Sequence, residues 1–192
     1  KKKNGKKIAC IGAGPASLTV ARDLMPLGYE VTIIEKNDRP GGLMWTNIPQ
    51  FRLPPEVLWE EINYVIDMGV ELRLNTPVES MKSLLDAGFD AIFVGSGAPR
   101  GKELDLPGRW EANNIHIGID WLESVAFGHT NSIEKNVLVI GVGNTAMDCC
   151  RTSKRIGGTN VKVMARKSKP YFKASSWELE DAEEELIDIV EN

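Results

Sequence analysis

The stretch IACIGAGPASLTV, residues 8–20, places two closely spaced glycines directly after a β-branched run. The nucleotide-binding fingerprint is G-x-G-x-x-G, with alanine allowed in the last place. Gly12 and Gly14 fill the first two places, and Ser17 fills the third. The first glycine makes the turn from strand to helix, the second lets the backbone approach a pyrophosphate, and the third must be small. Ser17 is small and its hydroxyl can bond the carbonyl one turn earlier, so we expect a working phosphate cradle.

The flanking segments give this cradle a parallel βαβ setting. Residues 7–11 read as a buried strand, 15–28 as a helix with proline in its first turn, and 29–36 as a second strand. Glu35 ends that strand, 23 residues after Gly12. A carboxylate there accepts hydrogen bonds from a ribose diol. The alternative is that Glu35 only caps a strand.

A second strand, glycine turn, helix and strand follow at residues 136–167. Gly141, Gly143 and Ala146 complete a regular fingerprint, but no acid follows the second strand. Basic residues occupy that region instead, and a guanidinium there grips a 2′-phosphate that a carboxylate would repel. This favours NADP(H), with NAD(H) or a solvated basic turn as the alternative. The basic residues are Arg166, Lys167 and Lys173.

Further elements divide the chain into two domains of Rossmann-like α/β fold. Helices are expected at residues 55–69, 80–88 and 117–128, and strands at 70–74 and 90–95. We assign 1–6 to a basic tail, 7–130 to an FAD-binding domain and 131–192 to an NAD(P)H-binding domain. The last segment reads as an acidic amphipathic helix, with Leu179, Leu186 and Ile189 on its dry side. Only two strands are recognisable in the second domain.

Composition excludes several other classes of protein. The chain has 192 residues, 42% of them hydrophobic, and a net charge of −4. No apolar run approaches the length of about 20 residues that a membrane span needs. The start, KKKNGKK, is not followed by an apolar core like that of a signal peptide. The lysine-rich start reads as a solvated tail, and no basic stripe extends it toward nucleic acid. Cys10, Cys149 and Cys150 form no metal-ligand spacing or redox C-x-x-C pair, which indicates a reduced, cytoplasmic protein without a metal site.

Two dinucleotides on one chain indicate hydride transfer from a nicotinamide to a flavin. That step needs close positioning and no general acid or base. We therefore nominate no catalytic side chain, and we place His116 and His129 in a loop or at a helix end. The missing cysteine pair also excludes a mechanism like that of thioredoxin reductase.

Beyond these patterns, the chain resembles a known family over nearly its whole length. The segments that carry the resemblance are GAGPASL, EKNDRPGGL, IPQFRLPPEVL, GVELRLNT and GNTAMDC. They are similar to the flavoprotein small subunit of glutamate synthase and to the FAD/NADPH domains of dihydropyrimidine dehydrogenase. PGGL followed by FRLP is more specific than either glycine motif.

The resemblance implies a glutathione-reductase-like, two-domain flavoprotein and the residues that hold its cofactors. The resemblance implies that FAD is bound by Gly12, Ala13, Gly14, Pro15, Ala16, Ser17, Glu35, Lys36, Gly42, Leu43, Arg52 and Val78. It implies that NADP(H) is bound by Gly141, Val142, Gly143, Asn144, Thr145, Arg166, Lys167 and Lys173. By the same resemblance, we expect the loop from Arg39 to Leu43 to lie against the flavin cofactor. Trp45 in the same segment either stacks near it or lies at an interface.

In the resembled family, electrons pass from flavin to iron–sulfur clusters, in a cysteine-rich segment or a partner. Only a lysine tail precedes the first strand here, so we expect the partner, an iron–sulfur protein or a large catalytic subunit, to hold them. Further strands also follow the acidic helix in the family, so we expect an incomplete second domain. The alternatives are a subunit that feeds a ferredoxin or another reductase, and a non-catalytic fragment.

Overall fold

The strand predicted at residues 7–11 lies in the middle of a parallel sheet. This strand, β1 (Lys7–Ile11), pairs with β2 (Glu30–Ile34) on one side and β4 (Ala91–Val94) on the other. β3 (Glu71–Arg73) pairs with β2, giving the order β3-β2-β1-β4. The strands β2 and β3 thus extend the sheet on one side of β1, and β4 extends it on the other side, so the strand order reverses at β1. In open α/β sheets, ligands bind at the carboxyl end of such a switch point.

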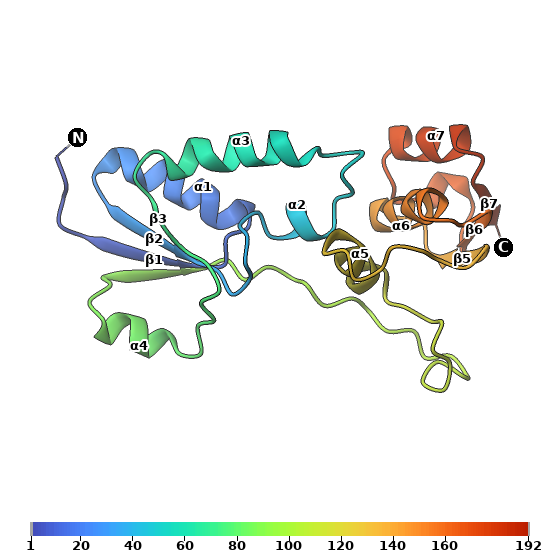
Figure 1. Cartoon of the computed structure of the whole chain (residues 1–192), viewed down its shortest axis with the longest axis horizontal. Coiled ribbons are helices and arrows are strands. Elements are labelled where there is room, and N and C mark those ends of the chain that lie inside the picture. Colours follow the sequence, from blue (N-terminus) through green and yellow to red (C-terminus); the bar gives the residue numbers. More distant parts are fainter. Residues whose placement is uncertain (1, 192) are drawn as a thin grey trace. The chain divides into compact units, whose positions relative to one another are not determined.

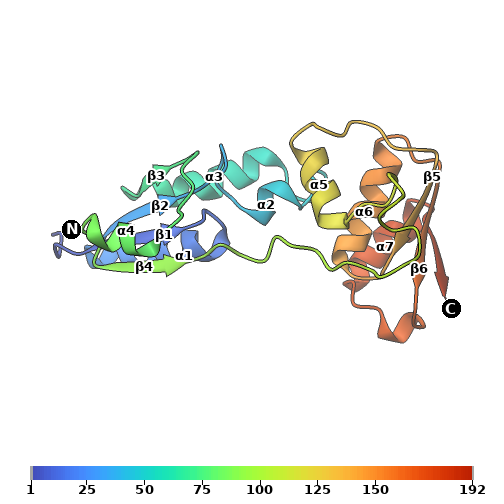
Figure 2. The same cartoon turned by 90° about the horizontal axis from the view of Figure 1, so that it is seen from below.

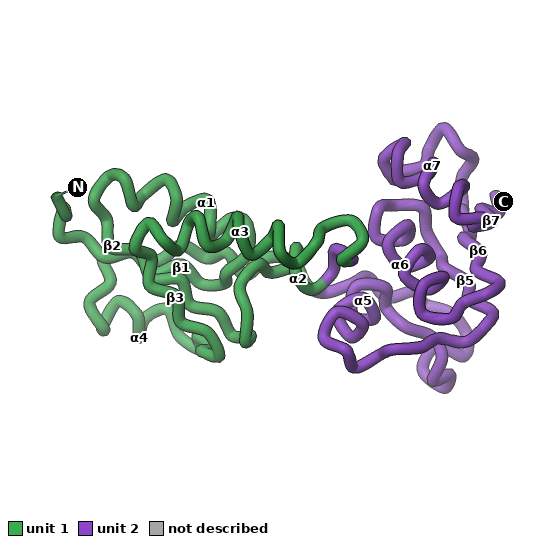
Figure 3. The backbone as a smooth tube through the Cα atoms, turned by 45° about the horizontal axis from the view of Figure 1, so that its top comes forward, with its two compact units in different colours: residues 1–46, 50–99 green, residues 47–49, 100–192 purple. Residues whose placement is uncertain are grey.

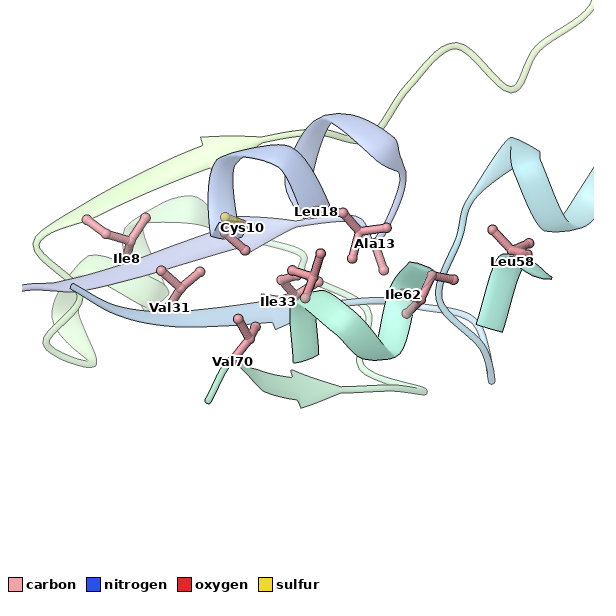
Figure 4. Close-up of a cluster of buried hydrophobic side chains, with 11 residues drawn as sticks. Ile8, Cys10, Ala13, Leu18, Val31, Ile33, Leu58, Ile62 and Val70 are labelled. Carbon is pink, nitrogen blue, oxygen red and sulfur yellow. The ribbon is translucent and has the colours of Figure 1, made fainter. Parts of the chain in front are cut away.

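Helices cover both faces of this sheet (Figure 1). α1 (Pro15–Leu24) and α3 (Pro55–Ile66) lie on one face, and the short α4 (Met81–Asp86) lies on the other. The core lies between the sheet and the two longer helices, where side chains from β1, β2, α1 and α3 meet (Figure 4). Cys10, Ile33 and Ile62 are its largest fully buried members. α1 confirms the helix predicted at residues 15–28, and the last turn of that range is the 3₁₀ helix η1 (Met25–Leu27).

The structure is a computed structural model that describes residues 2–191. Its contacts divide into two units, residues 1–46 with 50–99 and residues 47–49 with 100–192 (Figure 3). This division separates the two glycine turns, one to each unit. The assignment of 7–130 to FAD and 131–192 to NAD(P)H stays a prediction.

The second unit is a three-stranded parallel sheet with helices on one face (Figure 2). Val161 and Val163 point toward the helices and are buried, whereas Leu138 and Ile140 on the opposite face are about half exposed. Its core thus lies on one side of the sheet. In chain order the elements are α5 (Gly118–Ala126), β5 (Asn136–Ile140), α6 (Asn144–Arg155), β6 (Asn160–Ala165), α7 (Ser176–Glu184) and β7 (Asp188–Glu191).

The third strand of this sheet, β7, corrects two expectations. The acidic helix ends at Glu184 instead of continuing to the end of the chain. Leu186 then adopts φ 57° and is 83% exposed, so it does not belong to a dry helix face. Ile187 is buried and Ile189 packs against the core, because the chain alternates inward and outward as strands do. The many acidic residues in this segment favoured the prediction of one continuous amphipathic helix over a short alternating strand.

An ion-pair network joins α6 to α7. Arg151, whose side chain is 8% exposed, lies 3.0 Å from the buried Glu178 and 2.9 Å from both Asp181 and Glu185. Arg155 adds a 2.7 Å pair with Glu185. Burial alone raises the pKa of Glu185, but hydrogen bonds from Arg155 and Arg151 outweigh it and hold that pKa below its usual range. The network fixes α7 on the helix that follows the second glycine turn.

The lysine-rich start is more ordered than a free tail. The Asn4 N–H donates to Gly28 O at 2.9 Å, and Lys6 O accepts from the Glu30 N–H. The side chains of Lys2, Lys3 and Lys6 are exposed. Lys3 pairs with Glu30 and Lys6 with Asp90, both at 2.8 Å. Among residues 2–191, no helix is long and apolar enough to cross a membrane.

Candidate functional site: two glycine turns

The first glycine turn lies at the switch point between β1 and β4. Gly12 has φ +89°, and its N–H donates to Ile34 O at 2.8 Å. A Cβ on Gly12 would lie 2.6 Å from the carbonyl oxygen of Gly95, just beyond β4. Both the backbone angle and the close approach therefore require glycine at this position.

Ser17 in the third place packs as the small residue that the turn needs. It is fully buried, and a Cβ on Gly95 would collide with its Oγ. The expected hydrogen bond to the carbonyl one turn earlier is wrong, since Ser17 Oγ has no partner among the described residues. Serine thus fits by size, with an unsatisfied hydroxyl as its cost.

The start of α1 offers free backbone donors beside this turn. Gly14 is the N-cap, no side chain caps the helix in the described structure, and its first turn holds no acid. Pro15 and Ala16 are exposed there. Uncapped N–H groups and the positive end of the helix dipole suit a phosphate. The turn therefore fits a dinucleotide pyrophosphate by its own geometry.

Glu35 is tied directly to the glycine turn. It is 6% exposed, and one carboxylate oxygen accepts from the Ala13 N–H at 2.8 Å. The other oxygen accepts from the Asn37 N–H at 3.0 Å. Each carboxylate oxygen retains capacity for a further hydrogen bond, so this geometry suits both a structural tie and a ribose acceptor. Lys36 beside it is exposed.

The loop after β2 folds back onto the same turn. The Gly41 N–H donates to Ala13 O at 2.8 Å, and a Cβ on Gly42 would lie 2.9 Å from Gly14 Cα. Leu43, 41% exposed, begins the one-turn helix α2 (Leu43–Thr46). The predicted PGGL loop thus lies against the predicted cradle.

Two other predicted FAD residues lie farther along the chain. Val78 follows Thr76, whose N–H donates to Glu35 O at 2.8 Å, so its segment runs beside the end of β2. Arg52 is half-buried in the turn before α3. Their roles toward FAD stay predictions.

The second glycine turn repeats this design in the other unit. Gly141 has φ +123°, and its N–H donates to Met164 O at 3.0 Å, which joins the turn to β6. Gly143 is the N-cap of α6, again without a side-chain cap in the described residues or an acid in the first turn. Thr145 follows and is exposed. This turn also fits a pyrophosphate.

The segment before α7 is fastened to the second turn. Val142 O accepts from the N–H groups of Lys173 and Ala174, both at 3.0 Å. Asn144 Oδ1 accepts from the Ser175 N–H at 2.8 Å. These bonds bring the exposed Lys173 beside the glycine turn.

Two further cations lie at the end of β6. Arg166 and Lys167 directly follow this strand and are exposed, and Lys167 Nζ lies 5.7 Å from the Tyr171 ring centroid. β5 and β6 are parallel neighbours, so the glycine turn and these cations share one sheet edge. The structure therefore brings all the predicted residues of the second set to one edge.

The cysteines and histidines lie outside both turns. Burial raises the pKa of the Cys10 thiol to about 11 and those of Cys149 and Cys150 to about 12, so all three are unreactive thiols. His129 follows α5 and stacks on Phe127. Within residues 2–191 no cluster of three or more His, Cys, Asp or Glu side chains is arranged for a metal ion.

Comparison with known proteins identifies the family. The pyridine nucleotide-disulphide oxidoreductase family model matches residues 6–191. The chain belongs to this family. Its members are NAD(P)H-dependent flavin oxidoreductases that bind FAD and NADP(H).

The relatives within this family confirm the predicted resemblance. The NAD-dependent dihydropyrimidine dehydrogenase subunit PreT homolog of Salmonella typhi is 37% identical over 96% of this chain and 45% of its own length. The glutamate synthase [NADPH] small chain of Azospirillum brasilense is 34% identical over 97% of this chain and 41% of its own length. The chain thus spans less than half the length of these relatives.

A solved structure confirms the predicted fold class. FprA from Mycobacterium tuberculosis in complex with NADPH superimposes with a TM-score of 0.75, at 19% identity over 93% of this chain and 47% of its own. At this identity the similarity concerns the fold alone.

Three contacts around the glycine turns were not predicted from the sequence. Gly95 closes the first turn, and Gly41 donates to Ala13 O. Ser175 fastens the α7 segment to Asn144. GSG directly after β4 was a usable signal for Gly95, because a glycine at the end of a strand often marks a close backbone approach. The Ser175 contact depends on tertiary structure and had no local signal.

Proposed function

We propose that the chain is an FAD-dependent NADPH dehydrogenase module. It takes a hydride from NADPH onto FAD and passes electrons to the iron–sulfur clusters of a partner, as in glutamate synthase. FAD lies on the first glycine turn and NADPH on the second.

One observation carries this proposal. Within residues 2–191, α1 and α6 each begin behind a glycine turn without a side-chain cap, and the residues after the second strand of each βαβ unit differ. Glu35 directly follows β2 in the first unit, whereas Arg166 and Lys167 directly follow β6 in the second. An acid suits a free ribose diol and a base suits a 2′-phosphate, which supports FAD on the first turn and NADPH on the second.

The protein's own contribution to this chemistry is binding and orientation. Backbone N–H groups at the starts of α1 and α6 would hold the two pyrophosphates. Glu35 would accept from the adenosine ribose of FAD, and Arg166, Lys167 and Lys173 would hold the 2′-phosphate of NADPH. When bound, FAD supplies a two-electron acceptor for the hydride and can then release the electrons one at a time. No side chain needs to exchange a proton in the hydride step.

The electron acceptor is read by a surface rather than by a fingerprint. One relative is named as a glutamate synthase chain and another as a dihydropyrimidine dehydrogenase subunit, at similar identity. A second candidate function is therefore the same NAD(P)H-oxidising module within a different redox complex. The partner in either case is an iron–sulfur protein or a large catalytic subunit.

The test is anaerobic reduction of the FAD-loaded protein. NADPH or NADH is added without oxygen, and the loss of oxidised-flavin absorbance is followed. We expect NADPH to bleach the flavin, and faster than NADH does. Bound FAD that neither nucleotide bleaches would refute the dehydrogenase function.

Nucleotide preference gives a sharper prediction at Arg166. Arg166→Met removes one charge-assisted contact to the 2′-phosphate, worth about 1.5–3 kcal/mol, so the Kd for NADPH should rise roughly 10- to 100-fold. The Kd for NADH should stay the same. Lys162→Met is the matched control, since Lys162 is an exposed cation within β6, the strand that Arg166 follows, and pairs with Asp188. An equal loss for both nucleotides would contradict the assignment.

A further inference from the structure

Arg39, Trp45 and Trp59, which we call the tryptophan clamp, form a cluster beside the PGGL loop. The Arg39 guanidinium carbon lies 5.3 Å from the centroid of the Trp45 ring. The other contact is edge-to-face, with the rings of Trp45 and Trp59 5.5 Å apart at 65°. Asp38 orients Arg39 through two hydrogen bonds of 2.7 and 2.9 Å. The clamp thus links the loop, α2 and α3 within one unit.

Helix α2, which carries Trp45, cannot be stable by itself. It spans only Leu43–Thr46, and a single helical turn is unstable in water. It therefore depends on tertiary contacts. Edge-to-face aromatic pairs and cation–π contacts supply directional attraction of the kind found on both sides of Trp45.

The backbone of α2 is hydrogen-bonded directly to Gly42. The N–H groups of Trp45 and Thr46 both donate to Gly42 O at 3.0 Å. Gly42 has φ +54° and touches Gly14, the N-cap of α1. Movement of α2 would therefore release the carbonyl of the residue that packs on the first glycine turn.

Gly41 forms a second contact between the tryptophan clamp and the first glycine turn. A Cβ on Gly41 would lie 3.3–3.5 Å from Ile62 and Leu58 of α3 and from Trp45 Cβ. Its N–H donates to Ala13 O at 2.8 Å. The position of Gly41 is therefore set by α3 and Trp45 on one side and by the glycine turn on the other.

We propose that Trp45 is a positioning residue for the first cofactor site. The clamp fixes α2 on α3, and α2 fixes Gly41 and Gly42 against the glycine turn. The effect on FAD rests on the proposed function, whereas the hold on the glycines does not.

The test combines amide exchange without cofactor and FAD titration of matched variants. Trp45→Leu removes both ring contacts, Trp59→Leu removes one, and Trp45→Phe keeps an aromatic ring. The control is Trp110→Leu, which removes a similar arginine–tryptophan pair, at 4.9 Å from Arg109, in the other unit. Hydrogen exchange of the Gly41 amide reports the turn, and flavin fluorescence reports the Kd for FAD.

We expect the Gly41 amide of Trp45→Leu to exchange faster by on the order of tenfold, with a similar rise in the Kd for FAD. Trp45→Phe should recover most of both losses, and the Trp45→Leu/Trp59→Leu double variant should match Trp45→Leu alone. Trp110→Leu should change neither. If Trp45→Leu does not fold, Trp59→Leu gives the same readouts with a smaller change.

Two results would overturn the proposal. An unchanged Gly41 exchange rate would show that the clamp does not hold the turn. Faster exchange with an unchanged Kd for FAD would show that the hold does not serve the cofactor. A parent protein that binds no FAD, together with faster Gly41 exchange in the variants, would refute the proposed function while supporting the hold on the turn.

Discussion

Gly12→Ala is expected to destabilise the first unit by about 2–5 kcal/mol and to abolish FAD binding. A left-handed backbone at a residue with a side chain costs about 1–2 kcal/mol, and Gly12 has φ +89°. The new methyl group would also lie 2.6 Å from the Gly95 carbonyl oxygen, which is backbone and cannot rotate away. Overpacking of this kind adds about 1–3 kcal/mol. Urea unfolding followed by circular dichroism measures the sum.

Gly88→Ala is the matched control for this substitution. Gly88 has φ +93°, and a Cβ there would meet nothing within 4 Å. It should therefore show only the backbone cost of about 1–2 kcal/mol and leave FAD binding intact. Equal destabilisation by the two variants would mean that the close approach of Gly95 does not constrain the turn.

Arg151→Met is expected to lower the stability of the second unit by about 3–5 kcal/mol, the cost of removing one partner from a buried ion pair. Arg151 is buried, and the side chain of Glu178 opposite it is only 3% exposed. Methionine preserves most of the side-chain volume, so the loss reports charge rather than a cavity. Because Ser175, the N-cap residue of α7, donates its N–H to Asn144 Oδ1, NADPH binding should weaken as well.

Lys82→Met serves as the comparison for Arg151. Lys82 pairs with Asp86 at 2.8 Å, but the two side chains are 82% and 65% exposed. An exposed pair of this kind contributes about 0.3–0.5 kcal/mol. If Arg151→Met costs no more than Lys82→Met, the α6–α7 network does not stabilise this unit.

Local sequence was sufficient where each element carries its own signal. The βαβ order of both units followed from β-branched runs, Gly12 and Gly141 at the turns, and Pro15 at a helix start. The PGGL loop lies against the first glycine turn, and its predicted contact with FAD stays a prediction. In each of these cases, one short segment determines the geometry.

The sequence-based prediction failed where a segment could form either a helix or a strand, and where residues far apart in the sequence come into contact. The acidic composition around Leu186 suggested a helix, although the chain turns there into β7. The hydroxyl of Ser17 was expected to find a carbonyl, yet close packing against Gly95 leaves it without a partner among the described residues. The contacts of Ser175 and the tryptophan clamp join residues whose pairing no local periodicity encodes.

In the proposed function, the two glycine turns are separate sites, with FAD on the first and NADPH on the second. Gly14 and Gly143 test this assignment most directly, because a Cβ at either position meets nothing within 4 Å and neither has positive φ. Alanine at either position therefore leaves the fold intact and obstructs only an approaching phosphate.

The measurement is parallel equilibrium titration of the Gly14→Ala and Gly143→Ala variants with FAD and with NADPH. Loss of one phosphate contact is worth about 1.5–3 kcal/mol, so each affected Kd should rise roughly 10- to 100-fold. We expect Gly14→Ala to weaken FAD binding alone and Gly143→Ala to weaken NADPH binding alone, with unchanged melting temperatures. Weakening of both ligands by either variant, or of the opposite ligand, would contradict this assignment.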